Sequence, residues 1–182
     1  MPTETPEFVA PRQPAAATLA LIGLGANLGD AQATLRAALE DLARIPHSAP
    51  GRVSSLWRSA PVDAEGPDYC NAVAELHTCL QPLDLLHHLQ GIERHHGRRR
   101  PHGVRNAPRT LDLDLLCLGS LRMEHAELVL PHPRMHQRAF VLAPLQEIHP
   151  EWRLPDGRHI ADAVQGLRAG GQRLQRIAQA GV

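Results

Sequence analysis

The hydrophobic positions of the chain alternate between short apolar runs, which predict buried strands, and repeats at helical spacing. Residues 19–25 (LALIGLG) form such a run, and leucines at helical spacing follow between Asp30, a predicted helix N-cap, and Pro46. The same reasoning predicts strands at 52–58, at 71–80 and through 111–115, and helices from Pro82 through 92, within 131–148 and at 160–167. This order favours an α+β sandwich with a mainly antiparallel sheet.

Proline and glycine mark the segments between these elements. Residues 1–17 contain four prolines and neither a basic start nor a long apolar stretch, so we expect a loose N-terminal extension rather than a signal peptide. Residues 59–68 and 97–108 are predicted to be loops. Residues 18–182 are long enough for one domain with a substantial core.

Composition excludes several function classes. The 19 basic residues balance 19 acidic ones, so no overall field attracts nucleic acid or a membrane surface. All the basic residues counted there are arginines, which excludes P-loop and Schiff-base lysines. No apolar run reaches the roughly 20 residues of a membrane-spanning helix. Three cysteines without a CxxC pair argue against a disulfide framework and indicate a reduced, cytoplasmic protein.

Two carboxylates lie two residues apart in the last predicted strand. Alternating side-chain directions put Asp112 and Asp114 on one face of this strand and its leucines on the other. Their Cβ atoms are then about 7 Å apart, so the carboxylates can converge on one or two cations. Oxygen ligands of this kind suit Mg²⁺. The alternative is the solvated face of a half-buried antiparallel strand.

Arginines without acidic neighbours precede these aspartates. Residues 94–109 hold six Arg, three His and no acid. Unpaired guanidinium groups beside magnesium-binding carboxylates favour phosphoryl transfer, because its transition state requires charge to be neutralised on several oxygens at once. A merely solvated loop and an RNA-binding module are the alternatives. Zero net charge and the lack of a strand rich in aromatic residues disfavour RNA.

Two of the few aromatic residues lie near polar groups that suit a planar ligand. Tyr69 precedes Asn71 closely, and Phe140 follows a polar turn. A heterocycle stacked between these rings, with the Asn71 amide at its edge, is the functional interpretation. Core packing is the alternative for either ring, and base rates favour it for Phe140. Residues 23–30 (GLGANLGD) match a dinucleotide fingerprint only weakly and fit either a tight turn or close backbone approach to a ligand.

Seven ordered segments between about residue 19 and residue 160 carry a resemblance to a known family. They are LGANLGD, SSLWRSAP, PDYCNAVAEL, ERHHGR, APRTLDLDLL, LPHPRMHQRAF and APLQEIHPEW. Together they resemble the 6-hydroxymethyl-7,8-dihydropterin pyrophosphokinases of the folate pathway. The resemblance implies a ferredoxin-like α/β/α sandwich and an enzyme that moves pyrophosphate from ATP to the hydroxymethyl oxygen of the pterin, releasing AMP.

The resemblance also implies individual roles. Asp112 and Asp114 would hold two Mg²⁺ ions, and Arg98 and Arg109 would be catalytic by stabilising phosphate charge. The implied ATP-binding residues are Glu93, Arg98, Arg109, His132 and Arg138, and the implied pterin-binding residues are Gly25, Ser59, Ala60, Val62, Tyr69, Asn71 and Phe140. We therefore expect ATP and the pterin as partners, Mg²⁺ as the cofactor, no nucleic acid or membrane partner, and a monomer.

The chain departs from the family pattern at a few positions. Asn106 and Ala107 stand where some members carry Trp and Gly, and Pro133 stands where some relatives have an aromatic residue. These departures concern loop closure and adenine contacts rather than the metal site. An enzyme with altered or weakened activity is therefore a third interpretation.

Overall fold

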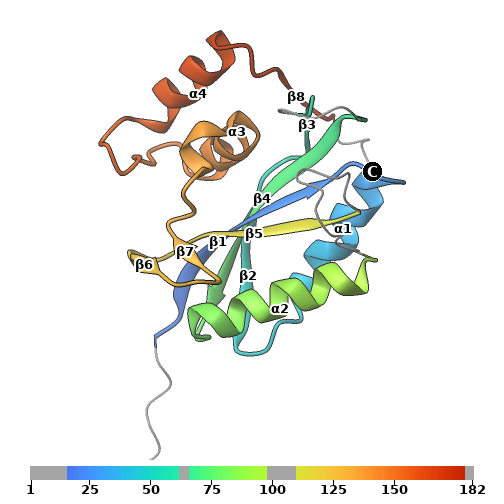
Figure 1. Ribbon diagram of the computed structural model, residues 1–182, viewed down its shortest axis with the longest axis vertical. Helices are drawn as coiled ribbons and strands as arrows, with labels where there is room; N and C mark the ends of the chain where they lie inside the picture. The colour runs from blue at the N-terminus through green and yellow to red at the C-terminus, as the bar shows by residue number, and fades with distance from the viewer. Residues whose placement is uncertain (1–15, 62–65, 98–109, 179–182) are drawn as a thin grey trace, which may run out of the picture.

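The structure, a computed structural model, describes residues 16–61, 66–97 and 110–178. An antiparallel sheet crosses the molecule, with the strand order β5-β1-β4-β3-β8 and with β2 also paired to β4 (Figure 1). Its strands are β1 (Thr18–Ala26), β2 (Ser48–Val53), β3 (Trp57–Ser59), β4 (Tyr69–Thr78), β5 (Asp112–Leu118) and β8 (Leu174–Arg176). The predicted α+β class with an antiparallel sheet is confirmed.

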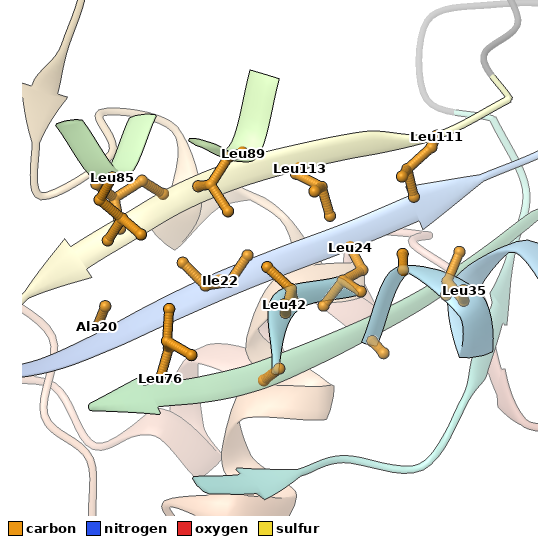
Figure 2. Packing of buried hydrophobic residues seen from close by; sticks show 14 of the residues in the cluster. Ala20, Ile22, Leu24, Leu35, Leu42, Leu76, Leu85, Leu89, Leu111 and Leu113 are labelled. Carbon is orange, nitrogen blue, oxygen red and sulfur yellow. The ribbon is translucent and has the colours of Figure 1, made fainter. Parts of the chain in front are cut away.

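Helices α1 (Ala31–Leu42) and α2 (Pro82–His95) cover one face of the sheet. The predicted N-cap of α1 is confirmed, because Asp30 Oδ1 accepts a hydrogen bond from the Ala33 N–H at 2.9 Å. Figure 2 shows Leu35 and Leu42 of α1 and Leu85 and Leu89 of α2 packed against the strands. The leucines that the sequence placed at helical spacing are therefore the residues that each helix buries against the sheet.

The opposite face carries α3 (Ala139–Ile148), against which α4 (Ile160–Ala169) packs. Leu21 of β1, Val73 of β4 and Cys117 of β5 point into this second layer. Since β1 is buried on both faces, it reads as a continuous apolar run rather than an alternation. The central strands thus connect two separate cores, and the α3 side leaves room for a cavity at one end.

Some elements differ from the predictions. The predicted strand at 52–58 falls on two short strands, β2 and β3, which residues 54–56 separate. In this gap the Ser54 N–H donates to Val73 O, and Ser54 Oγ accepts from the Val73 N–H. The helix predicted within 131–148 begins only at Ala139 and continues through Pro144. Elements not predicted are the hairpin β6 (Met123–Glu124) and β7 (Val129–Leu130), the 3₁₀ turn η1 (Met135–Gln137), and β8.

Several predictions concern segments outside this description. Residues 1–15 of the predicted extension and residues 98–108 of the predicted arginine loop lie outside the described residues. The division into an extension and one domain stays a prediction. Within the described residues, no helix is long and apolar enough to span a membrane. The three cysteines form no disulfide, and burial raises the pKa of Cys70 and Cys117 to about 11, so these two thiols stay protonated at neutral pH.

Candidate functional site

A cavity of about 400 Å³ lies between β1, β4, β5 and the start of α3. Ten of the residues predicted to form the site line it: Gly25, Ser59, Ala60, Tyr69, Asn71, Asp112, Asp114, His132, Arg138 and Phe140. They come from segments up to 115 positions apart (25 to 140), so only the fold brings them together. This convergence makes the cavity the candidate active site.

The two aspartates lie on the cavity face of β5, and the leucines between and beside them are in the core. The predicted alternation is therefore confirmed. In the register of the sheet, Gly23 of β1 is opposite Asp114, and Gly25 is opposite Asp112. Because glycine has no side chain, β1 places nothing beside either carboxylate. Gly23 and Gly25 of GLGANLGD thus line the cavity without filling it, whereas the sequence left open a tight turn or close approach to a ligand.

Asp114 lies beside one guanidinium group and one imidazole ring. Arg138 Nη1 donates to Asp114 Oδ2 at 3.2 Å, and His132 Nε2 lies 4.0 Å from the same oxygen, which is too long for a hydrogen bond. His132 Nδ1 accepts from the Arg134 N–H at 3.2 Å, so neutral His132 carries its proton on Nε2. Burial lowers the pKa of His132, and Arg138 and Arg134 lower it further against the opposing effect of Asp114.

A polar pair forms the opposite end of the cavity. Asn71 Nδ2 donates to Ser59 Oγ at 2.9 Å, and both residues are buried. The bond fixes the orientation of the Asn71 carboxamide, whose second N–H and carbonyl oxygen can read the edge of a heterocycle. Gly25 pairs with Asn71 in the sheet, and a Cβ at Gly25 would lie 3.4 Å from Asn71 Oδ1. A methyl group there would enter the space that a ligand at this end requires.

Aromatic side chains contribute to the same cavity. Tyr69 begins β4, and Phe140 is the second residue of α3. The guanidinium carbon of Arg138 lies 5.5 Å from the centre of the Phe140 ring, so the ring also holds the cation that bonds Asp114. Phe140 packs at the edge of the second core as well. Phe140 therefore packs on the core and also lines the cavity, while its contact with a ligand stays a prediction.

Glu93 is the described site residue that does not line the cavity. Its side chain is buried beneath β5, where Oε1 accepts a hydrogen bond at 2.8 Å from the backbone N–H of Leu113. Since Leu113 stands between the two aspartates, Glu93 supports the strand that presents them. Three other predicted residues lie outside the described residues: Val62, Arg98 and Arg109.

Other cavity residues were missed by the sequence analysis. Arg134 and Gln137 belong to the PHPRMHQR turn, where their polarity was a usable signal. Gln172 comes from the segment between α4 and β8, and its sequence neighbours Gly170, Gly171 and Arg173 gave no sign of a site. A contact of this range follows only from the packing of α4 on α3.

The donor set suits Mg²⁺ with a phosphate ligand. No group of three or more His, Cys, Asp or Glu side chains placed to hold a metal occurs among the described residues. Among the described residues that line the cavity, Asp112 and Asp114 supply the carboxylate oxygens, next to the guanidinium groups of Arg134 and Arg138, which suit phosphate. Mg²⁺ commonly binds through one or two carboxylates, with water and substrate phosphate completing its shell. The residues present fit such an ion.

Comparison with known proteins gives consistent similarities. The family model described as 7,8-dihydro-6-hydroxymethylpterin-pyrophosphokinase (HPPK) matches residues 21–150. A 2-amino-4-hydroxy-6-hydroxymethyldihydropteridine pyrophosphokinase of Pseudomonas aeruginosa is 44% identical over 144 residues, which are 79% of this chain and 88% of that protein. One of Synechocystis sp. is 40% identical over 147 residues, 80% of this chain and 74% of that protein.

Solved structures agree on the fold. A crystal structure of HPPK-DHPS in complex with substrates superposes with a TM-score of 0.66 at 12% identity, covering 86% of this chain and 44% of that one. HPPK-DHPS of Plasmodium falciparum gives a TM-score of 0.62 at 14% identity, covering 82% and 44%. This chain thus spans less than half the length of these solved chains. The likeness confirms the ferredoxin-like α/β/α sandwich.

Proposed function

Because the chain belongs to the 7,8-dihydro-6-hydroxymethylpterin-pyrophosphokinase family, the pyrophosphokinases of folate biosynthesis, we propose that its cavity binds ATP with Mg²⁺ and 6-hydroxymethyl-7,8-dihydropterin. Pyrophosphate passes from ATP to the hydroxymethyl group of the pterin there, and AMP is released. The observation that carries the proposal is the meeting of paired carboxylates, cationic side chains and a bonded Asn–Ser pair in one cavity. A cytoplasmic monomer is part of the same proposal.

Asp112 and Asp114 are the residues that would hold Mg²⁺. They share the cavity face of β5, and glycines stand opposite both of them in β1. Bound Mg²⁺ would neutralise charge on the triphosphate and fix its orientation. The backbone of β5, held by Glu93 through the Leu113 N–H, sets the spacing of the two carboxylates.

Basic residues surround the proposed phosphate position. Arg138 would contribute a charge and neutral His132 an Nε2–H donor, both at the side of Asp114. Arg98 and Arg109 are proposed as the catalytic arginines, and Glu93 as a residue of the nucleotide side. A guanidinium group can bond two phosphate oxygens at once, which suits the charge that develops on the transferred group.

The opposite end of the cavity is the proposed pterin site. Tyr69 and Phe140 would stack on the two faces of the ring, and Asn71, oriented by Ser59, would bond its edge. The open space over Gly25, together with the backbone of Ser59, Ala60 and Val62, would shape the rest. In this arrangement the hydroxymethyl oxygen would face the aspartates. It would lose its proton to solvent water as it bonds the β-phosphorus, while the bond from that phosphorus to the AMP oxygen breaks and AMP leaves.

AMP formation from ATP, measured with and without the hydroxymethylpterin, tests this function directly. Asp112→Ala and Asp114→Ala should each reduce magnesium-dependent AMP formation by on the order of 10²-fold or more, whereas the exposed control Asp162→Ala on α4 should retain it. Full turnover in both cavity variants would overturn the metal assignment. Salt-dependent RNA binding with no pterin-dependent AMP would instead support a binding module.

A further inference from the structure

We propose that Gln172 is a positioning residue that fixes the backbone of Arg138 and thereby sets the affinity of the cavity for nucleotide phosphate. The inference rests on the function proposed above, in which Arg138 binds phosphate. Gln172 lies beyond residues 21–150, the part of the chain that the family model matches. It lines the cavity together with Arg138.

The Gln172 carboxamide makes two hydrogen bonds, one on each side of Arg138. Its Oε1 accepts from the Ala139 N–H at 2.8 Å, and its Nε2 donates to Gln137 O at 2.9 Å. Arg138 has an extended backbone, with φ −118° and ψ 105°. In an extended residue, the preceding carbonyl and the following N–H point to the same side, as they do in a parallel sheet. One primary amide can therefore bond both groups and hold the two dihedral angles of Arg138.

These bonds also satisfy the start of α3. The first N–H groups of a helix have no partner within the helix, and an N-cap side chain usually supplies one. Arg138 occupies the N-cap position but forms no side-chain cap among the described contacts. Ala139 is fully buried, so an unpaired N–H there would carry the penalty of a buried unsatisfied donor. Gln172 supplies the acceptor from 33 positions further along the chain.

The consequence for the site lies in the side chain of Arg138. Its Nη1 bonds Asp114 at 3.2 Å and its guanidinium group lies over the Phe140 ring. Both contacts depend on the direction in which Cβ leaves the backbone. A small rotation at φ or ψ is amplified along this long side chain, so loosening the backbone would move the guanidinium group relative to Asp114 and to a bound phosphate.

Gln172 is itself held on both sides. Before it, α4 ends at Ala169, and Gly171 adopts φ +99°, a conformation that side chains rarely allow. The Gln172 N–H donates to Leu167 O at 3.1 Å. After it, β8 pairs with β3 at the edge of the sheet, as Figure 1 shows. The carboxamide is thus presented from a segment anchored at both ends.

A double-mutant cycle separates positioning of Arg138 from general support of the fold. We would measure the affinity for a non-hydrolysable ATP analogue with Mg²⁺ in Gln172→Leu, in Arg138→Ala and in the double variant. Loss of two hydrogen bonds predicts about 10-fold weaker binding in Gln172→Leu, and no further weakening when the same change is made in Arg138→Ala. Gln175→Leu, at an exposed position of β8, should bind as the unchanged protein does.

Two further measurements keep the test decisive. Amide exchange at Ala139 should be faster in Gln172→Leu but unchanged in Gln175→Leu. If Gln172→Leu does not fold, Gln172→Met replaces it: its unbranched side chain has a similar length but forms neither hydrogen bond, so it should weaken binding by a similar factor.

Unchanged affinity in both Gln172 variants, or an equal loss with and without Arg138, would overturn the positioning role alone. If the protein without any substitution binds no nucleotide, the proposed function is overturned, and the effect of Gln172 on phosphate affinity is overturned with it.

Discussion

Arg138 donates a hydrogen bond from Nη1 to Oδ2 of Asp114 across 3.2 Å. The guanidinium group of Arg138 therefore forms a hydrogen bond to the carboxylate that we propose as a metal ligand. Removing it should have opposite effects on two ligands. Arg138→Ala should weaken binding of an ATP analogue, because a phosphate contact is lost, and strengthen binding of Mn²⁺ alone, because Asp114 loses a competing partner.

Each change should be roughly 5-fold, the size expected of a partly exposed charge pair. Calorimetric titration with the nucleotide and with Mn²⁺ measures both. Arg122→Ala, an exposed substitution, is the control. If Arg138→Ala binds both Mn²⁺ and nucleotide with the affinity of the unsubstituted protein, Arg138 does not contribute to this site.

Gly25→Ala tests the pterin end of the cavity. The added Cβ would lie 3.4 Å from Asn71 Oδ1 and 4.0 Å from Tyr69 Cδ1, both ordinary contacts, so the fold should accept it. The methyl group would nevertheless crowd a bound pterin, and overpacking of this kind predicts about 10-fold weaker pterin binding. Fluorescence titration with the hydroxymethylpterin measures this. Gly166→Ala, on α4 with nothing within 4 Å of its Cβ, should leave pterin binding unchanged, and equal affinities for all three proteins would argue against this pterin site.

Phe140 is predicted to contribute ring stacking as well as packing. Phe140→Leu keeps much of the apolar contact with the second core but removes the ring, so pterin affinity should fall by about 10-fold while thermal stability changes little. Phe140→Tyr keeps the ring and should retain most of the affinity. If the leucine and tyrosine variants bind the pterin equally well, stacking by Phe140 is wrong.

Glu93→Ala should affect both stability and metal binding. The buried N–H of Leu113 would lose its acceptor, which predicts a decrease in the free energy of unfolding of about 1–3 kcal/mol. Because Leu113 separates the two aspartates, the Mg²⁺ concentration for half-maximal activity should rise. Urea unfolding and a magnesium titration of AMP formation measure the two effects. Glu40→Ala, on the exposed side of α1, should change neither, and an unaltered magnesium requirement in Glu93→Ala would limit Glu93 to a structural role.

Glu147 makes the free energy of unfolding depend on pH in the acidic range. Its carboxylate accepts bonds from Ser55, Trp57 and Arg176, and it thereby joins α3 to β3 and β8. Burial acts to raise the pKa of Glu147, but these donors outweigh it and hold the pKa below its ordinary value of 4.5. Because the pKa of Glu147 is higher in the unfolded chain, a falling pH protonates Glu147 in the unfolded chain before it protonates Glu147 in the folded protein. The stabilisation is therefore complete above about pH 4.5 and is lost as the pH falls through the pKa of the folded state.

Urea unfolding at about pH 6 and about pH 3 tests this dependence. Glu147→Gln should be less stable than the unchanged protein at the higher pH, and the difference should shrink at the lower one. Glu124→Gln, at an exposed position of β6, should follow the unchanged protein at both. A difference that stays constant across this range would mean that the charge of Glu147 contributes nothing.

The sequence predicted features that depend on local pattern. Alternation along β5 correctly separated the core leucines from Asp112 and Asp114, and helical spacing placed α1 and α2. The break between β2 and β3 could not be read locally, because it depends on bonds between Ser54 and Val73. Gln172 likewise acts through bonds to a turn 33 to 35 positions earlier. Contacts of this range arise only once the layers have packed.

The alternation along β5 also ties catalysis to correct folding. A slip of one residue against β1 would turn Asp112 and Asp114 into the hydrocarbon interior and move Leu113 and Leu115 to the cavity side. Such a chain would lose both proposed metal ligands and part of its core in the same error. The burial of one face of β5 therefore strongly specifies its register against β1.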